Sequence, residues 1–237
     1  MKVMTFNIQH ALDFQKRVID TGLFAHAIAR HAADVCGLNE VRGAGPIEGY
    51  TDQTSAIGES LGFHHYFGEA IRVGGTSPYG NAIVSRMPFK SAETFSIPDP
   101  ADRSEEGRFE SRCVVKAVIN VQGVDICFLV CHMGLNPSER HNAVETICSI
   151  LDSCDMPAVL MGDFNTTPDT SVLQPLRARM KDTTTEDSIP NAFTFPSDRP
   201  HIKIDYIFYR GLKCVKTITI NQIYADHLPI LAEFQVR

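Results

Sequence analysis

Apolar and alternating runs, separated by polar connections rich in Gly and Pro, follow one another along most of the chain. Short runs of this kind predict strands, and an apolar residue at every third or fourth position predicts a helix. The expected strands cover residues 1–8, 34–41, 64–70, 80–86, 90–97, 111–121, 124–134, 157–165, 202–210, 215–221 and 228–236. The expected helices cover residues 20–31, 54–61, 138–148 and 171–180, with Asp20 placed to cap the first of them.

The arrangement of these elements predicts an α/β fold in which two sheets pack face to face with helices outside. Short connections between residues 64 and 97 favour antiparallel neighbours. Two polar segments, 98–107 and 181–197, predict long loops, which often border functional sites. A chain of 237 residues fits around one core, so we expect a single domain over residues 1–237.

Composition and charge narrow the functional classes. Hydrophobic residues make up 43% of the chain and charged residues 21%, which indicates neither disorder nor a membrane protein. The net charge is −6 and the basic residues are scattered, so nonspecific affinity for nucleic acid is not favoured. A basic patch assembled by folding from distant residues stays open.

Cysteine usage and the opening sequence favour a cytoplasmic location. The seven cysteines are odd in number, include no CxxC pair and lie mostly in apolar runs, which is typical of buried reduced thiols. The opening MKVMTFNI has a strand pattern and lacks a basic segment followed by a long apolar stretch. No later run is long enough to span a membrane.

Polar side chains stand where several apolar runs end. A buried strand is expected to release ionisable side chains only at solvent or at a site. Taken singly, such residues usually belong to turns or caps, but their joint occurrence indicates one site. They are Asn7, Glu40, His132, Asp163 with Asn165, Asp205 and, before the last strand, Asp226 with His227.

These positions lie in motifs that resemble the successive signatures of the endonuclease/exonuclease/phosphatase superfamily, the DNase I-like metal-dependent hydrolases. The resemblance runs from Thr5 to Ile230. It departs from the family pattern at Asn39, where Gln is common, and at Ala225, where Ser is common, and neither departure removes an expected ligand. The motifs are MTFNI, LNEV, YGNAIVSR, CHMGLNPSER, MGDFNTTPD, KIDYIFYR and ADHLPI.

The resemblance implies a four-layered α/β sandwich, a site at one edge of the two sheets, and Mg²⁺ or Mn²⁺ as cofactor. The residue types agree, because Mg²⁺ prefers oxygen ligands and needs only one or two carboxylates. Asn7, Glu40 and Asp226 can supply these oxygens. Zinc would favour Cys and closely spaced His ligands, a spacing that the sequence lacks.

The resemblance also implies roles in the hydrolysis of a phosphate ester. His227, oriented by Asp205, is expected to act as a base or as a phosphate contact, and Asp163 to position or deprotonate the attacking water. Asn165 is expected to donate its amide to a nonbridging oxygen. His132 is expected to contact the phosphate or to protonate the leaving group.

Two further residues resemble supporting positions of the family. Asn81 in YGNA and Arg112 in FESR are expected at the substrate phosphate, where a guanidinium can donate two parallel hydrogen bonds. A strand-turn Asn and a surface Arg are the alternatives, and the neighbouring Tyr79 can be explained by packing alone.

The site residues indicate the reaction type and leave the substrate open. The charge favours a phosphodiesterase or phosphatase of a small or lipid phosphoester, since the chain lacks a basic segment interleaved with aromatic residues. The first alternative is a DNA or RNA nuclease, with a basic surface beside the site and an activity that declines steeply with salt. The second, a catalytically silent binding protein, is disfavoured because every expected ligand is present.

Overall fold

Two six-stranded sheets form the centre of the molecule. The computed structural model describes residues 1–184 and 192–236. The first sheet has the order β11-β12-β1-β2-β4-β3 and the second the order β5-β6-β7-β8-β10-β9. The strands of the first are β1 (Lys2–Asn7), β2 (Val35–Arg42), β3 (His64–Val73), β4 (Ser77–Ser85), β11 (Lys213–Thr219) and β12 (Ile230–Gln235). Those of the second are β5 (Phe89–Ser96), β6 (Cys113–Val121), β7 (Val124–His132), β8 (Ala158–Asp163), β9 (Lys181–Asp182) and β10 (Asp205–Arg210).

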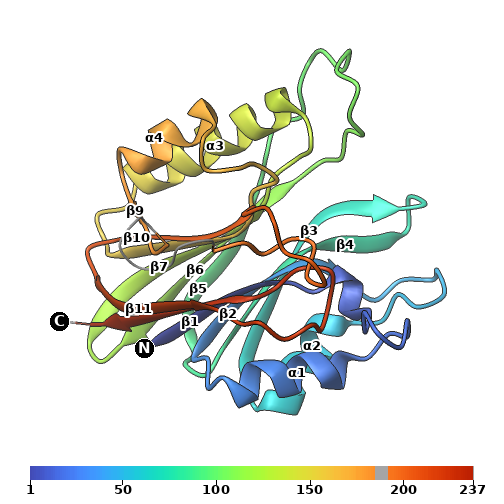
Figure 1. The fold of residues 1–237 in the computed structure, drawn as a ribbon, viewed down its shortest axis with the longest axis horizontal. Helices are drawn as coiled ribbons and strands as arrows, with labels where there is room; N and C mark the ends of the chain where they lie inside the picture. The colour runs from blue at the N-terminus through green and yellow to red at the C-terminus, as the bar shows by residue number, and fades with distance from the viewer. Residues whose placement is uncertain (185–191, 237) are drawn as a thin grey trace.

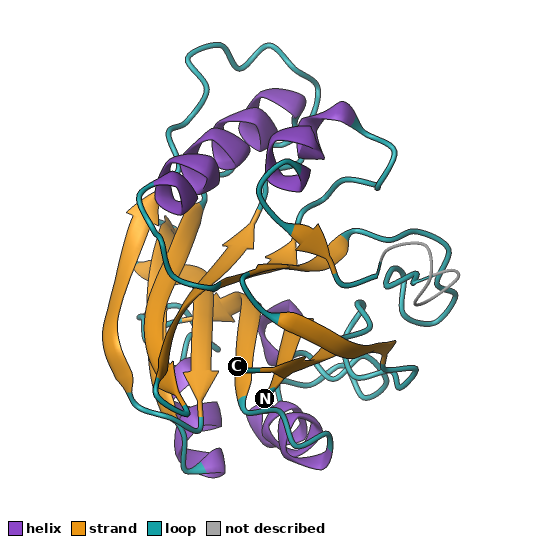
Figure 2. Cartoon of the chain, turned by 90° about the vertical axis from the view of Figure 1, so that its left-hand side faces the viewer, coloured by secondary structure: helices purple, strands orange, loops and turns teal. Residues whose placement is uncertain are grey.

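Helices cover the outer face of each sheet (Figure 1). The first sheet carries α1 (Thr21–Arg30) and α2 (Gln53–Leu61), and the second carries α3 (Pro137–Asp152) and the short α4 (Gln174–Arg177). Figure 2 shows the same layers from the side. The expected four-layered α/β sandwich is therefore confirmed.

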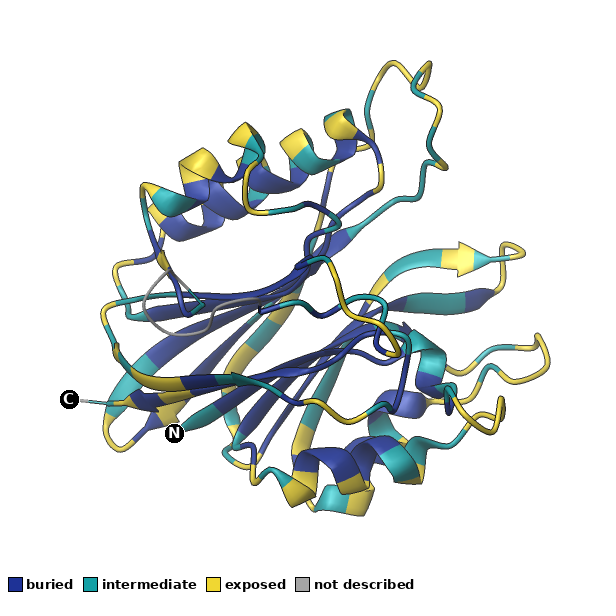
Figure 3. Cartoon of the chain, viewed as in Figure 1, coloured by how far each residue is buried: buried dark blue, intermediate teal, exposed yellow. Residues whose placement is uncertain are grey.

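Buried apolar residues from both sheets form one cluster between them. Figure 3 shows the central strands of both sheets coloured mostly as buried. Val3 and Val35 of the first sheet belong to one cluster with Val130 and Met161 of the second. The sheets approach each other closely at Gly37, where an added Cβ would lie 2.7 Å from Met161 Cγ. A residue without a side chain is therefore required at this point in β2.

Asp20 caps α1 as predicted, accepting a hydrogen bond of 3.0 Å from the backbone N–H of Leu23. The expected loop 98–107 has no regular structure and is tied to the start of α3. Glu105 accepts a hydrogen bond of 3.2 Å from the backbone N–H of Ser138, and the carbonyl of Gly107 accepts one from Asn136. These bonds satisfy backbone and side-chain groups at a helix N-terminus, which otherwise lack partners.

Three predicted elements differ from the structure. The strand expected over 202–210 begins only at Asp205, because Ile202 pairs instead with Phe195 through a hydrogen bond of 3.1 Å. The strand expected over 215–221 is displaced to β11. The helix expected over 171–180 divides into a 3-10 turn, Ser171–Leu173, and α4, because Pro175 has no N–H to continue a helix that starts at Ser171.

The segment expected to be a loop, 181–197, contains the two-residue strand β9, and its residues 185–191 lie outside the described residues. All seven cysteines are free and six are buried, as predicted. Burial raises the pKa of thiols such as that of Cys131, which keeps them protonated. Within the described residues, no helix combines the length and hydropathy needed to cross a membrane.

Candidate active site

Strand ends bring the predicted residues to one edge of the two sheets. β7 and β8 are parallel neighbours with His132 opposite Asp163, and β10 runs antiparallel to β8 with Asp205 opposite Asp163. In the first sheet, Asn7 ends β1 next to β2, which carries Glu40. A hydrogen bond of 3.1 Å from Asn7 Nδ2 to Asp163 Oδ2 joins the two sheets. The structure thus gathers residues that are far apart in the sequence.

Asp163 is the centre of this cluster. Its buried Oδ2 lies 3.5 Å from His132 Nε2 and 3.6 Å from His227 Nε2. The backbone N–H of Asn165 donates to Asp163 Oδ1, and the backbone N–H of Asp163 donates to Asn39 Oδ1, both at 2.9 Å. Burial raises the pKa of Asp163 against the opposing charge of His227. A carboxylate with a raised pKa is a stronger base than an exposed one.

His227 is held between carboxylates. Its Nδ1 lies 2.9 Å from Asp205 Oδ2, which leaves Nε2 directed toward Asp163. The ring of Phe195 packs against the imidazole with the centroids 4.8 Å apart. Burial alone would lower the pKa of His227, but the charges of Asp205, Asp163 and Asp226 raise it overall. The imidazole can therefore offer an N–H to an anion.

His132 has a donor beside each ring nitrogen. Its Nδ1 lies 3.1 Å from a guanidinium nitrogen of Arg112, and its Nε2 lies 3.0 Å from Nδ2 of Asn165, which also bonds the carbonyl of Met133 at 2.9 Å. A neutral imidazole has one accepting nitrogen, so it can accept from only one of these two donors, and Asp163 Oδ2 lies 3.5 Å from Nε2. Burial and the charge of Arg112 hold the pKa of His132 well below its usual value.

Glu40 and Asp226 offer oxygens to a hard cation. Glu40 accepts hydrogen bonds from Asn7 Nδ2 at 3.0 Å and from the Tyr79 hydroxyl at 2.9 Å. Asp226 Oδ1 is buried and has no hydrogen-bond partner among the described residues. Burial raises the pKa of Asp226, and the negative charge of Glu40 adds to the rise. Two carboxylates that repel each other and an unpaired buried oxygen fit a divalent cation such as Mg²⁺ or Mn²⁺.

A second group of ligating atoms lies beside this pair. Asp163, Asp205 and His227 each offer one atom that could bind a metal, a carboxylate oxygen or a ring nitrogen. These three atoms lie within 4.8 Å of one another. Asp205 and His227 already share a hydrogen bond, whereas Asp205 Oδ1 is buried without a partner among the residues that the structure describes. In this arrangement the two carboxylates of the group, Asp205 and Asp163, orient the imidazole of His227.

Asn7 does not face the carboxylates with its oxygen. Its Nδ2 donates to Glu40 and Asp163, and its Oδ1 accepts from the backbone N–H of Gln9 at 3.1 Å. Asn7 therefore holds two carboxylates in place, and its oxygen would reach a cation only after the amide turned over. The two ends of an amide have nearly the same shape, so this turn needs little space.

Asn81 does not reach the substrate cavity, contrary to the expectation of a phosphate contact. Its Oδ1 accepts from Asn39 Nδ2 at 2.8 Å, and its Nδ2 donates to the carbonyl of Cys113 at 3.0 Å. Because both polar ends are occupied inside the protein, Asn81 acts on the site through Asn39, which in turn holds Asp163. Arg112 does line the cavity, and it also forms an ion pair of 3.0 Å with Glu110.

Three side chains at the site were not predicted from the sequence. Asn39 and Tyr79 hold Asp163 and Glu40 as described above. Arg140 lines the cavity and donates to the carbonyl oxygens of Leu135 at 2.6 Å and of Asn165 at 3.2 Å. Their membership of the motifs LNEV, YGNAIVSR and CHMGLNPSER was the signal that could have identified them.

Left-handed backbone is concentrated at the same edge. Glu40 has a φ of 59° and Asn165 a φ of 48°, and the 3-10 turn after β1, Gln9–Ala11, has φ values of 45–58°. Residues other than Gly rarely adopt this region, which costs on the order of 1–3 kcal/mol each. The surrounding packing and hydrogen bonds therefore hold the backbone of the site in place at the expense of stability.

These side chains surround a cavity of about 650 Å³, a size suited to a small organic ligand. Hydroxyl groups and arginines form one part of its wall, and apolar side chains form another. The lining residues are Glu40, Arg112, His132, Leu135, Arg140, Asp163, Asn165, Thr166, Thr167, Thr170, Phe195, Ile202, Ile204, Asp226 and His227.

The chain is similar to known proteins over nearly its whole length. Residues 4–227 match the family described as Endonuclease/Exonuclease/phosphatase. Among solved structures, an endonuclease/exonuclease/phosphatase from Beutenbergia cavernae superposes with a TM-score of 0.81 at 26% identity, covering 100% of this chain and 71% of that one. A family protein from Leptotrichia buccalis gives a TM-score of 0.80 at 23% identity, with all of both chains covered. The mannosyl-6-phosphatase of Bacteroides thetaiotaomicron gives 0.77 at 15% identity, also over all of both chains. No curated protein matches the sequence significantly.

Proposed function

Because the chain belongs to the Endonuclease/Exonuclease/phosphatase family, whose members are hydrolases acting on phosphate esters, we propose that it is a divalent-metal-dependent phosphoesterase of a small or lipid phosphoester. One observation carries the proposal. A repelling carboxylate pair, Glu40 and Asp226, and a buried base with two imidazoles, Asp163 with His132 and His227, line one cavity of about 650 Å³.

Glu40 and Asp226 would hold the cation, Mg²⁺ or Mn²⁺, with Asn7 positioning Glu40. When bound, the cation would neutralise charge on the phosphoryl group and polarise its oxygens. Tyr79 and Asn7 each donate to a different oxygen of Glu40, so the carboxylate is held in one orientation before any ion arrives. Such preorganisation lowers the cost of binding.

Asp163 is the proposed base for the attacking water. It is a buried carboxylate that lies near both imidazoles, and its raised pKa strengthens it as a proton acceptor. His227, fixed by Asp205, would direct its Nε2–H to a phosphoryl oxygen. Asn165 would give its amide to a second oxygen, and His132 would offer its Nε2–H to the leaving group.

The size and walls of the cavity support a small substrate or the head group of a lipid. Thr166, Thr167 and Thr170 offer hydroxyls, and Phe195 with Ile202 offers an apolar surface, so the wall suits an ester with both polar and apolar parts. A net charge of −6 supports this choice over a nucleic acid, which binds through phosphate neutralisation. The seven free thiols support a cytoplasmic location, where thiols stay reduced.

The proposal is tested by hydrolysis of bis(p-nitrophenyl) phosphate and p-nitrophenyl phosphate with Mn²⁺ supplied. Asp163→Ala, His227→Ala and Glu40→Ala should each lower turnover by at least about 10², whereas Glu59→Ala, an exposed position on α2, should not. Unchanged turnover in all three site variants would end the proposal. Calorimetric titration with Mn²⁺ should show weaker binding in Glu40→Gln. His132→Gln and Glu59→Gln should bind Mn²⁺ as the wild type does.

The substrate class is tested by a panel of phosphomonoesters, phosphodiesters, phospholipids and nucleic acids. Turnover of a small or lipid ester that changes little with salt is the expected result. Faster turnover of DNA or RNA, declining steeply as salt rises, would identify a nuclease instead.

A further inference from the structure

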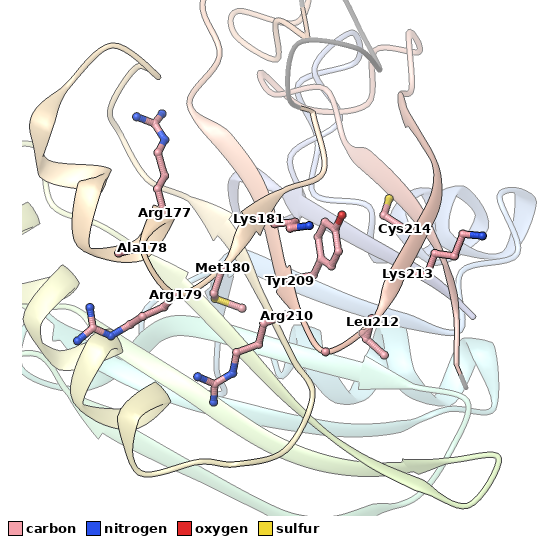
Figure 4. Close-up of a pocket in the computed structure, with 11 residues that line it drawn as sticks. Arg177, Ala178, Arg179, Met180, Lys181, Tyr209, Arg210, Leu212, Lys213 and Cys214 are labelled. Atoms are coloured by element: carbon pink, nitrogen blue, oxygen red, sulfur yellow. The ribbon is translucent and has the colours of Figure 1, made fainter.

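A second cavity lies at the end of β10 far from the candidate active site. It has a volume of about 590 Å³ and lies between α4, β9 and the turn from β10 to β11 (Figure 4). β10 begins at Asp205, in the candidate active site, and ends at Arg210, in this cavity. Six strand residues at about 3.4 Å each place the two ends roughly 17 Å apart.

Among the residues that the structure describes, five cationic side chains and no acidic one line this cavity: Arg177, Arg179, Lys181, Arg210 and Lys213. They are brought together from two segments, residues 177–181 and 210–213, of a chain whose net charge is −6. Clustered like charges repel one another, so this arrangement costs free energy when no anion is present. A surface assembled in this way is one that an anion would stabilise.

Two of the cations are rigidly held. Arg179 forms two hydrogen bonds of 2.7 Å with the carboxylate of Asp152, and Arg210 donates to the carbonyl oxygens of Leu151 and Cys154 at the end of α3. The carboxylate of Asp152 neutralises one guanidinium, whereas the carbonyls leave the charge of Arg210 in place. These contacts fix one wall of the cavity before a ligand binds.

The other wall carries cations that have no partner in the described part of the chain. Lys181 lies opposite Tyr209 in the β9–β10 pairing, and Lys213 follows the turn (Figure 4). Both lysines are exposed, and neither forms an ion pair or a side-chain hydrogen bond among the described residues. The hydroxyl of Tyr209, likewise without such a bond there, is a further donor at this wall.

We propose that this cavity binds a small anion bearing more than one phosphate group, such as an organic polyphosphate. The volume lies in the range of small-ligand pockets, whereas a nucleic acid strand needs a long basic surface. Lys181 and Lys213 bind the phosphates as mobile charges, and the guanidinium of Arg210 supplies a fixed one. The proposal is independent of the chemistry proposed for the candidate active site.

Tripolyphosphate is the probe that tests this proposal, titrated calorimetrically into the full chain in low salt without divalent cations. Saturable binding with one site is expected, weakened about fivefold by Lys181→Ala or by Lys213→Ala and more than tenfold by both. The matched control is Lys216→Ala, which removes an exposed lysine of the same strand, outside the cavity, and should leave binding unchanged. Thermal melting of each variant checks that it is folded.

A second pair of measurements locates the bound probe. Arg112→Ala, in the candidate active site, should leave tripolyphosphate binding unchanged. If Arg112→Ala abolishes binding and the two lysine variants do not, the probe binds at the active site and the proposal is overturned. Equal weakening by Lys216→Ala, or tight binding of a single-stranded oligonucleotide without binding of tripolyphosphate, overturns it as well.

Discussion

Removal of the Asn39 amide is expected to destabilise the fold and to impair the site at once. Asn39 is fully buried and makes three hydrogen bonds: its Nδ2 donates to Asn81 Oδ1 at 2.8 Å and to the carbonyl of Cys131 at 3.1 Å, and its Oδ1 accepts from the backbone N–H of Asp163 at 2.9 Å. It therefore connects β2 in the first sheet to β7 and β8 in the second.

The magnitude follows from the groups left without partners in Asn39→Ala. Each buried polar group that loses its partner costs about 1–3 kcal/mol, and three such groups remain. We expect the free energy of unfolding to fall by at least about 3 kcal/mol, the sum of the three lowest costs and a large part of the total for a typical domain. The turnover number should fall as well, because Asp163 loses the bond that positions its backbone.

Equilibrium unfolding in urea, followed by circular dichroism, measures this loss. The control is Asn120→Ala, which removes an exposed Asn whose amide makes hydrogen bonds with Asp125 and Gly123 and should cost less than about 1 kcal/mol. A loss in Asn39→Ala no greater than in this control would refute the reasoning. So would an intact turnover number in a destabilised but folded variant.

Three further changes test other parts of the structure. Tyr79→Phe removes the 2.9 Å hydrogen bond to Glu40 and should weaken Mn²⁺ binding several-fold in calorimetry with little effect on unfolding; unaltered affinity would contradict the role given to the hydroxyl. Asp205→Asn should lower the turnover number by at least about 10² with a smaller change in KM, because His227 loses the carboxylate charge at 2.9 Å that holds and orients it; wild-type kinetics would remove Asp205 from the site. Gly37→Ala should cost at least about 1–3 kcal/mol in urea unfolding, since its Cβ would lie 2.7 Å from Met161 Cγ; a neutral effect would mean that the two sheets can separate locally.

The sequence by itself predicted the layers and most of the strands, because alternating and apolar runs report directly which faces are buried. It also indicated the residues that meet at the sheet edge. His132 and Asp163 stand at the last position of largely buried strands and Asp205 at the first position of another, and an ionisable side chain is tolerated there only at a site or at solvent.

Partnerships between side chains were decided by the tertiary structure. The sequence could not show that Asn81 bonds Asn39 instead of a phosphate, that Asn7 turns its nitrogen to the carboxylates, or that Tyr79 holds Glu40. Each of these contacts crosses between segments more than 30 residues apart, and hydropathy patterns carry no information about distance between segments.

The cationic cavity at the end of β10 is the clearest case. In the sequence, these cations form two separate short groups, one at residues 177–181 and one at residues 210–213, in a chain whose net charge is −6. They become neighbours because β9 pairs with β10 and the chain turns back into β11 at that point. The hydrophobic pattern of a helix or strand determines which of its faces is buried. The charge of a surface depends instead on which segments of the chain the fold brings side by side.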